Sequence, residues 1–249
     1  MTYCLGIKVD AGLLFCSDSR TNAGIDQIHS YRKMHRFGVP GARQFILMSS
    51  GNLATTHGVI NQLQDDIDNG APLNLFNTLS LHQTAEYIGR TLTGQEAKTG
   101  GGSMFAGYFI LGGQIKGKPM GLFLIYPEGN YIAASEREPY LQIGESKYGK
   151  PILDRIITPS TDLNTCALCA LVSMDSTIRS NVSVGPPIDI QLYEADSLNL
   201  STYYCLTEES AYWRRVNLAW HEKLMEAFRG LPSLESAAAE CRGPAGSAP

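Results

Sequence analysis

Thr2 is the residue of this sequence with the clearest chemical capacity, because removal of Met1 would leave it at the amino terminus. A hydroxyl and a free α-amine on one residue can act as a nucleophile and its own base. An α-amine has an unperturbed pKa of roughly 7.7–8, so it can carry a proton at neutral pH. Asp18 lies sixteen residues after Thr2, and Lys33 lies fifteen residues after Asp18. The sequence therefore predicts a hydroxyl nucleophile accompanied by a carboxylate and an ammonium group.

An amino-terminal hairpin is expected to position these groups. Residues 2–10 and 13–18 alternate in the way that two paired strands do, with turn residues between them. In such a hairpin Thr2 would lie across from about residue 20, and Asp18 would lie beside the amino end. The nucleophile and the carboxylate would then be brought together by the hairpin alone.

The rest of the chain alternates pairs of strands with pairs of helices. Further strands are expected at 45–48, 105–115, 120–126, 131–134, 140–143, 188–193 and 203–206. Helices are expected at 53–68, 82–98, 147–157, 162–178 and about 213–227. This order indicates an α+β fold of four layers, an αββα sandwich of two antiparallel sheets with an added C-terminal helix. One domain is expected over residues 1–229, and the Gly-, Ala-, Ser- and Pro-rich residues 230–249 are expected to be disordered.

The composition gives no indication of a nucleic-acid, membrane or metal partner. The net charge of −4 and the pI of about 5.7 give no reason to expect binding to nucleic acid. No apolar run reaches the length of a membrane span and no secretory signal is evident, so a cytoplasmic protein without membrane contact is expected. Cys166 and Cys169 have the spacing of metal ligands, but no second Cys pair or His pair accompanies them. They are interpreted as a packed helix face, and no metal site is expected.

Five segments of the chain resemble proteasome β-type subunits, and more closely the bacterial Anbu (ancestral β subunit) family. The segments are residues 1–8, 17–24, 48–53, 173–177 and 179–187. The last one, Arg-Ser-Asn-Val-Ser-Val-Gly-Pro-Pro, resembles Anbu specifically. The resemblance extends from residue 2 to about residue 228, and it implies the fold and the chemistry of an N-terminal-nucleophile hydrolase.

The resemblance implies a role for each of five residues. The Thr2 hydroxyl would attack the scissile carbonyl, while Asp18 holds Lys33 and the Lys33 ammonium lowers the pKa of the attacking group. The backbone N–H of Gly51 would stabilise the oxyanion, at a turn where the lack of a side chain permits close approach. Asp175 would support the terminal amine. Nucleophile, base and oxyanion donor would all come from the chain, so no cofactor is expected.

Three positions depart from the family pattern. The segment before Lys33 is one residue shorter than usual, so Arg32 competes for its role. Gly144-Glu145-Ser146 stands where the family has a Gly-Ser-Gly turn, so the Ser that steadies the terminal amine is displaced or lost. The Ser expected soon after the late Asp is either Ser176 or Ser180.

The expected function is that of a threonine-type peptidase or amidohydrolase in a proteasome-like homo-oligomer, an open ring or helical assembly. Thr21 and Asn22 would hold a peptide as an added strand, and Ser49 and Leu53 would line the pocket. Thr2 follows Met1 directly, so methionine aminopeptidase alone would expose it. Two alternatives stay open: a catalytically idle ring-forming scaffold, and an N-terminal-nucleophile hydrolase that acts on a small amide instead of a peptide.

Overall fold

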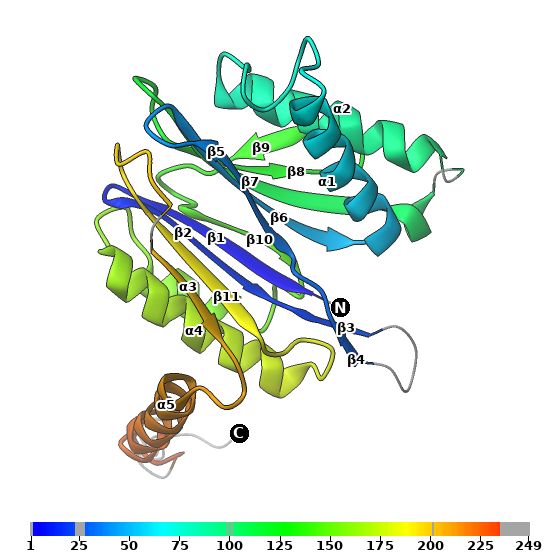
Figure 1. Cartoon of the computed structure of the whole chain (residues 1–249). Coiled ribbons are helices and arrows are strands. Elements are labelled where there is room, and N and C mark those ends of the chain that lie inside the picture. The colour runs from blue at the N-terminus through cyan, green and yellow to red at the C-terminus, as the bar shows by residue number, and fades with distance from the viewer. Residues whose placement is uncertain (1, 23–27, 99, 101, 201, 235–249) are drawn as a thin grey trace, which may run out of the picture.

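Two antiparallel sheets of five strands each form the centre of the fold (Figure 1). The computed structural model describes residues 2–22, 28–98, 100, 102–200 and 202–234. The first sheet has the order β10 (Tyr140–Gly144), β1 (Tyr3–Val9), β2 (Gly12–Asp18), β11 (Ile188–Glu194) and β12 (Tyr203–Leu206). The second has the order β5 (Met34–Val39), β6 (Arg43–Gly51), β7 (Gly107–Ile115), β8 (Gly121–Ile125) and β9 (Tyr131–Ala133).

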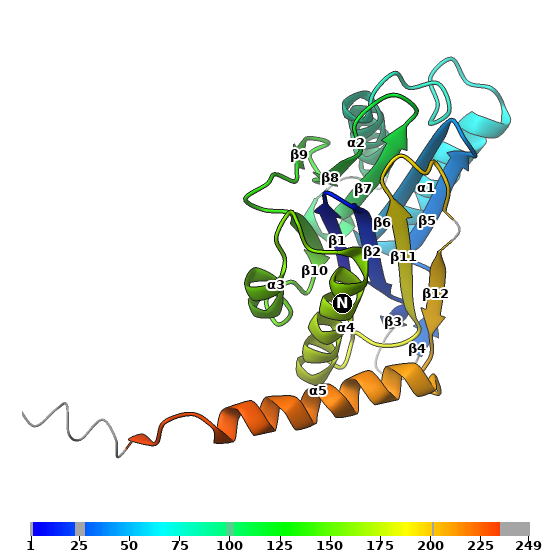
Figure 2. The same ribbon diagram turned by 90° about the vertical axis from the view of Figure 1, so that its left-hand side faces the viewer.

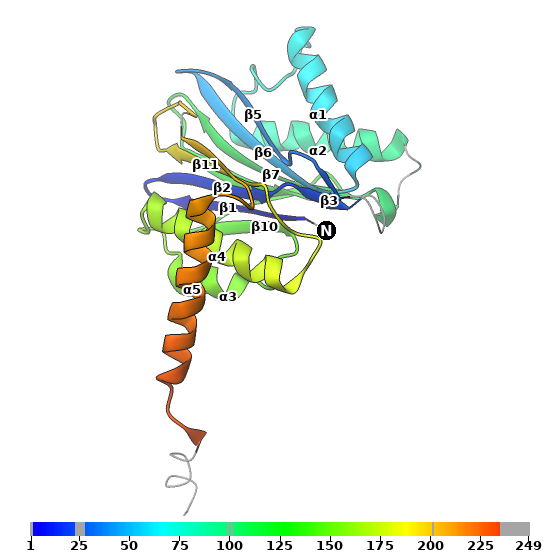
Figure 3. The same cartoon turned by 60° about the horizontal axis from the view of Figure 1, so that its bottom comes forward.

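Helices cover the outer face of each sheet (Figures 1 and 2). The second sheet is covered by α1 (Leu53–Asp68) and α2 (Leu81–Lys98), and the first by α3 (Lys150–Ile156) and α4 (Leu163–Ser180). A final helix, α5 (Ala211–Arg229), extends away from the sheets (Figure 3). Within the described ranges, no helix combines the length and the apolar character that crossing a bilayer would require.

Three apolar clusters separate these layers, and strand alternation explains them. Tyr3, Leu5 and Ile7 of β1 point to one side and pack with residues of α4. Cys4, on the other side of β1, packs with Met48 of β6 in the cluster between the two sheets. The third cluster joins the second sheet to α1 and α2. The predicted αββα sandwich of two antiparallel sheets with an added C-terminal helix is confirmed.

The amino-terminal hairpin forms at the predicted turn. Cys4 pairs with Ser17, and Val9 pairs with Gly12. Extended by two residues, this register places Thr2 across from residue 19, where the sequence predicted about residue 20. The difference of one residue leaves Asp18 beside the amino end, as expected.

The structure contains three strands that the sequence pattern did not predict. β3 (Arg20–Asn22) and β4 (Ile28–Ser30) pair with each other, and β5 forms the edge of the second sheet. β3 and β4 have three residues each, which is too short a run for alternation to show. Of the predicted disordered tail, residues 235–249 lie outside the described residues.

The last helix contacts the rest of the molecule mainly near its start. Trp213 is 5% exposed and packs in the cluster beside α4. Further along α5, Leu218, Leu224 and Phe228 are 59%, 50% and 69% exposed. The helix therefore combines a short core contact near its start with a longer exposed part.

Candidate active site

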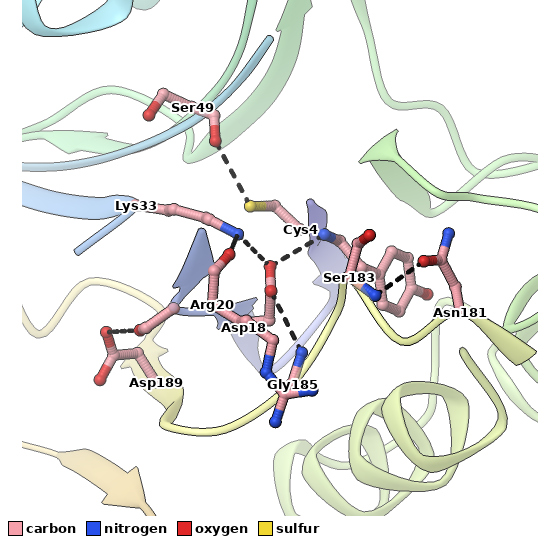
Figure 4. Close-up of polar contacts among 11 residues, drawn as sticks. Cys4, Asp18, Arg20, Lys33, Ser49, Asn181, Ser183, Gly185 and Asp189 are labelled. Atoms are coloured by element: carbon pink, nitrogen blue, oxygen red, sulfur yellow. Dashed lines mark hydrogen bonds and ion pairs between the residues drawn. The ribbon is translucent and has the colours of Figure 1, made fainter. Parts of the chain in front are cut away.

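Asp18 and Lys33 form a buried ion pair beside the amino-terminal end of β1 (Figure 4). Lys33 Nζ donates to Asp18 Oδ1 over 2.7 Å, and the Asp18 side chain is fully buried. The same oxygen accepts the backbone N–H of Tyr3 at 2.9 Å, and Oδ2 accepts that of Gly185 at 3.3 Å. Burial raises the pKa of Asp18, while the Lys33 ammonium and the two backbone donors oppose this shift. Three donors thus hold the carboxylate, and one of them belongs to the residue that follows Thr2.

Lys33 reaches this carboxylate from the segment that precedes β5. Its ammonium also donates to the carbonyl of Arg20 at 2.7 Å, which takes the second of its three N–H donors. Lys33 Nζ and Tyr3 N donate to the same oxygen, so the distance between these two nitrogens is smaller than the sum of the two hydrogen-bond lengths. Arg32 is exposed, so of the two candidates it is Lys33 that faces Asp18. This arrangement places a cation next to the amino end of β1.

Thr2 is half-buried and lies just before β1. Its carbonyl accepts the backbone N–H of Glu145 at 2.7 Å, next to the pair that Tyr3 makes with Gly144. Gly144 has φ +84°, and a Cβ at this position would lie 1.9 Å from the Thr2 carbonyl oxygen. Only glycine permits this approach and this conformation. The turn after β10 therefore fixes the backbone of Thr2.

Gly51 ends β6, and one residue separates it from α1. Its φ is +102°, and a Cβ there would lie 2.2 Å from the carbonyl oxygen of Ala106. The next residue, Asn52, caps α1 by accepting the N–H of Thr55 at 3.1 Å. Gly51 is exposed and precedes a helix N-terminus, where free N–H groups and the helix dipole favour negative charge.

A contact between the two sheets brings Gly51 and Thr2 to the same end of the molecule. Cys4 Sγ donates to the carbonyl of Ser49 at 3.7 Å (Figure 4). Cys4 lies two residues after Thr2, and Ser49 lies two residues before Gly51. Residues two apart share a strand face. Thr2 and Gly51 are therefore each two residues from this contact, on the same faces as Cys4 and Ser49. Burial raises the pKa of the Cys4 thiol well above its ordinary value, in agreement with a core role.

The four predicted substrate-binding residues come from three elements. Ser49 is buried in β6, and its backbone N–H donates to the Lys33 carbonyl at 3.0 Å. Leu53 begins α1 and is 38% exposed. Thr21 and Asn22 belong to β3, which pairs with β4, and their side chains lie outside the described part of the structure.

Two of the three predicted residues of α4, Asp175 and Ser176, have partners within their own helix. Asp175 Oδ2 accepts from Arg179 Nε at 2.8 Å, one turn further along. The Ser176 hydroxyl donates to a carbonyl one turn earlier at 3.1 Å, and Ser180 is exposed at the helix end. The segment that contacts the buried ion pair comes after the helix, where the Gly185 N–H reaches the carboxylate.

Two residues near Thr2 were missed as site residues by the sequence reasoning. The side chain of Glu145 is 7% exposed, and its Oε2 accepts from Asn181 Nδ2 at 3.1 Å. The signal for Glu145 was the departure at residues 144–146, where a carboxylate stands in place of the expected Ser. Asn181 lies in the stretch that resembles Anbu, but nothing in its spacing indicated a contact with Glu145.

Solved structures identify the family to which the chain belongs. An Anbu (ancestral β-subunit) protein from Yersinia bercovieri is 44% identical with a TM-score of 0.90, and the match covers 93% of this chain and 99% of that chain. The chain belongs to the Anbu family. Anbu from Pseudomonas aeruginosa, described as a helical assembly of the Anbu complex, is 45% identical with a TM-score of 0.89, over 93% of this chain and 97% of that chain.

A third Anbu structure agrees with this assignment. It is a Gly-1 mutant from Hyphomicrobium sp. strain MC1, 39% identical with a TM-score of 0.90, over 94% of this chain and 99% of that chain. Neither protein-family models nor curated proteins give a significant match. The predicted resemblance to Anbu is confirmed by the structural matches.

The two cysteines of this Anbu chain that have the spacing of metal ligands are core residues. Cys166 and Cys169 lie in the cluster between α4 and the first sheet, and burial raises the pKa of each thiol to about 12. A metal binds the thiolate, so such thiols are poor ligands. Among the described residues, no group of three or more His, Cys, Asp or Glu side chains is arranged to hold a metal ion.

Proposed function

We propose that this Anbu protein is a threonine-type N-terminal-nucleophile hydrolase, a peptidase or amidohydrolase that uses Thr2 after Met1 has been removed. The observation that carries the proposal is the buried Asp18–Lys33 pair, which shares one carboxylate oxygen with the N–H of Tyr3. The buried Lys33 ammonium lies beside Tyr3, the residue that follows Thr2. A cation in such a site favours the anionic form of the Thr2 hydroxyl.

The proposed reaction has two halves. The Thr2 hydroxyl attacks the scissile carbonyl and its own α-amine takes the proton, while the Gly51 N–H stabilises the oxyanion. The amine then gives the proton to the leaving amine, and the acyl group stays on Thr2 as an ester. In the second half the α-amine takes a proton from water, which attacks the ester and restores Thr2. Asp175, together with either Ser176 or Ser180, keeps its predicted role of supporting the amine.

Substrate binding would use the strands around this site. An extended peptide would pair with the backbone of Thr21 and Asn22, with Ser49 and Leu53 beside its side chains. Such pairing provides affinity through main-chain hydrogen bonds, so the reaction does not depend on one side chain of the substrate. The reaction needs no metal or organic cofactor.

We infer that the protein acts as a homo-oligomer in the cytoplasm. The relative from Pseudomonas aeruginosa forms a helical assembly, and an open ring or helix would suit this chain as well. The exposed apolar side chains of α5, which include Leu224 and Phe228, are the kind of surface that association covers.

The intact mass of the purified chain, before and after incubation with a peptide α′,β′-epoxyketone, tests the proposal. The Thr2 hydroxyl adds to the ketone of this reagent and its free amine opens the epoxide, so both groups are needed. The expected result is loss of the Met1 mass, followed by a gain of one reagent mass. Thr2→Ser should keep the adduct, whereas Thr2→Ala should abolish it and leave the oligomer size unchanged.

Each alternative predicts a different result. A processed chain that forms no adduct, in an oligomer of normal size, would refute the enzyme proposal and favour the idle scaffold. An adduct in a protein that cleaves small amides but no peptides would favour the small-amide hydrolase.

A further inference from the structure

A buried carboxylate next to Thr2 has only a long ion pair, to an exposed lysine, among the described residues. The side chain of Glu145 is 7% exposed, and Asn181 Nδ2 donates to its Oε2 at 3.1 Å. Lys147 Nζ stands 3.9 Å from Oε1, and the Lys147 side chain is 72% exposed. That distance exceeds a hydrogen bond, and a pair with a solvated lysine contributes little. A buried carboxylate is costly unless a nearby cation and hydrogen bonds compensate for its lost hydration.

The backbone places this carboxylate beside the terminal amine that processing would create. The Glu145 N–H donates to the Thr2 carbonyl at 2.7 Å, and Gly144 packs directly against the same carbonyl. The Thr2 nitrogen is two bonds from that carbonyl carbon, a distance that a glutamate side chain spans. Asn181 anchors Oε2 from the segment after α4, and its own Oδ1 accepts the Ser183 N–H at 3.0 Å (Figure 4).

We propose that Glu145 is a positioning residue, and that its carboxylate binds the α-ammonium of Thr2 once Met1 has been removed. The inference rests on the proposed function, because it requires a free Thr2 amine. Asn181 holds one carboxylate oxygen, which leaves Oε1 to face the amine. Glu145 then performs the task that the family pattern assigns to the Ser of the Gly-Ser-Gly turn, with a charge in place of a hydroxyl.

The charge has a consequence that a hydroxyl would not have. An anion within about 4–6 Å raises the pKa of an amine by about one unit or more. The neutral amine is the base in the proposed reaction, so Glu145 moves the acidic limb of the rate profile to higher pH. It also keeps the amine turned toward the Thr2 hydroxyl.

Other charged groups on the packed elements act on the same amine. Lys33 opposes the effect of Glu145, and its charge is compensated by Asp18. Lys147 lies in the turn after β10, on the solvent side of Glu145. On α4, Asp175 is paired with Arg179. Asp18 and Asp175 each have a cation in hydrogen-bond contact, and the backbone N–H of Glu145 binds the Thr2 carbonyl. Glu145 is therefore the carboxylate whose removal should change the pKa of the amine most.

The test measures the rate of epoxyketone adduct formation by intact mass from pH 5 to 9, in wild type and three variants. In Glu145→Gln, the midpoint of the acidic limb should fall by about one pH unit. At a pH well below both midpoints, the rate as a fraction of its plateau should then be about tenfold higher than in wild type. Glu128→Gln removes an exposed carboxylate from the turn after β8 and should leave the profile unchanged. In Lys147→Gln, an exposed change that should not disturb folding, the midpoint should rise by a few tenths of a unit, because a competing cation is lost.

The outcomes separate this inference from the proposed function. A wild type without an adduct at any pH would overturn the proposed function, and this inference with it. A reactive wild type with unmoved midpoints in Glu145→Gln and Lys147→Gln would overturn the role of Glu145 and leave the enzyme proposal intact. If Glu145→Gln does not fold, the profile of Lys147→Gln decides, and an unmoved midpoint there refutes the inference.

Discussion

Replacement of Asp18 by Asn tests whether the buried ion pair holds the candidate site together. Asn keeps the shape of the side chain but has one acceptor oxygen and an NH2 group in place of two acceptors. Oδ1 of Asp18 accepts two donors and Oδ2 accepts a third, so the NH2 group must face at least one donor. Lys33, whose side chain is 7% exposed, also loses its counter-ion.

The magnitude follows from the burial of both partners. Removing one partner of a buried pair costs about 3–5 kcal/mol, because the other charge is left without compensation. For a chain of this length, 1 kcal/mol corresponds to about 2–4 °C, so we expect the Tm of Asp18→Asn to fall by roughly 6–20 °C.

Urea denaturation and thermal melting measure this loss. The matched control is Glu226→Gln, whose pair with Lys223 joins side chains that are 70% and 75% exposed, and it should change the free energy of unfolding by less than about 1 kcal/mol. The double variant Asp18→Asn/Lys33→Met removes both charges and should recover part of the loss. A loss below about 1 kcal/mol in Asp18→Asn, with no recovery in the double variant, would refute the reasoning.

Two further predictions concern Gly51 and His35. Gly51→Ala should lose epoxyketone reactivity and about 2 kcal/mol or more of stability, because φ is +102° and the Ala106 oxygen lies 2.2 Å from the new Cβ. The control is Gly41→Ala, where φ is +75° and the new Cβ meets no atom within 4 Å. This variant should lose about 1 kcal/mol of stability and keep its reactivity. Burial and the nearby His57 lower the pKa of His35 from 6.5 to about 4. As the pH falls, His35 is protonated in the unfolded chain before it is protonated in the folded one. The free energy of unfolding should therefore fall by at most about 3 kcal/mol between about pH 6.5 and 4, and this contribution should stay constant below pH 4. In His35→Gln, the urea midpoint should depend less on pH over this range than in wild type.

The layers of the fold were predictable because local patterns coincide with burial in the final structure. The alternation of residues 2–18 fixed the hairpin, and helical periodicity fixed α1 and α2 to within one residue of their observed ends. The hairpin register also brings Asp18 beside Thr2, since pairing across a two-residue turn is a local property. These features depend on neighbours in sequence, which a single sequence contains.

The surroundings of Thr2 were less predictable because they depend on loops from distant parts of the chain. Glu145 follows the last residue of β10, and Asn181 follows the last residue of α4. Their contact spans 36 residues and joins two irregular segments, for which no periodic pattern exists. The competition between Arg32 and Lys33 was likewise decided by tertiary packing, which buries one side chain and exposes the other.

The last helix has a consequence for how the family can diverge. Trp213 is the residue of α5 that is buried, whereas Leu218, Leu224 and Phe228 remain exposed. Substitutions on this exposed part leave the packing of both sheets untouched, so mutational drift there should carry little thermodynamic penalty for the single chain. If this exposed part forms the contact proposed above, stability and self-association are encoded in separate stretches of sequence, and selection can alter the geometry of an assembly without passing through unstable folds.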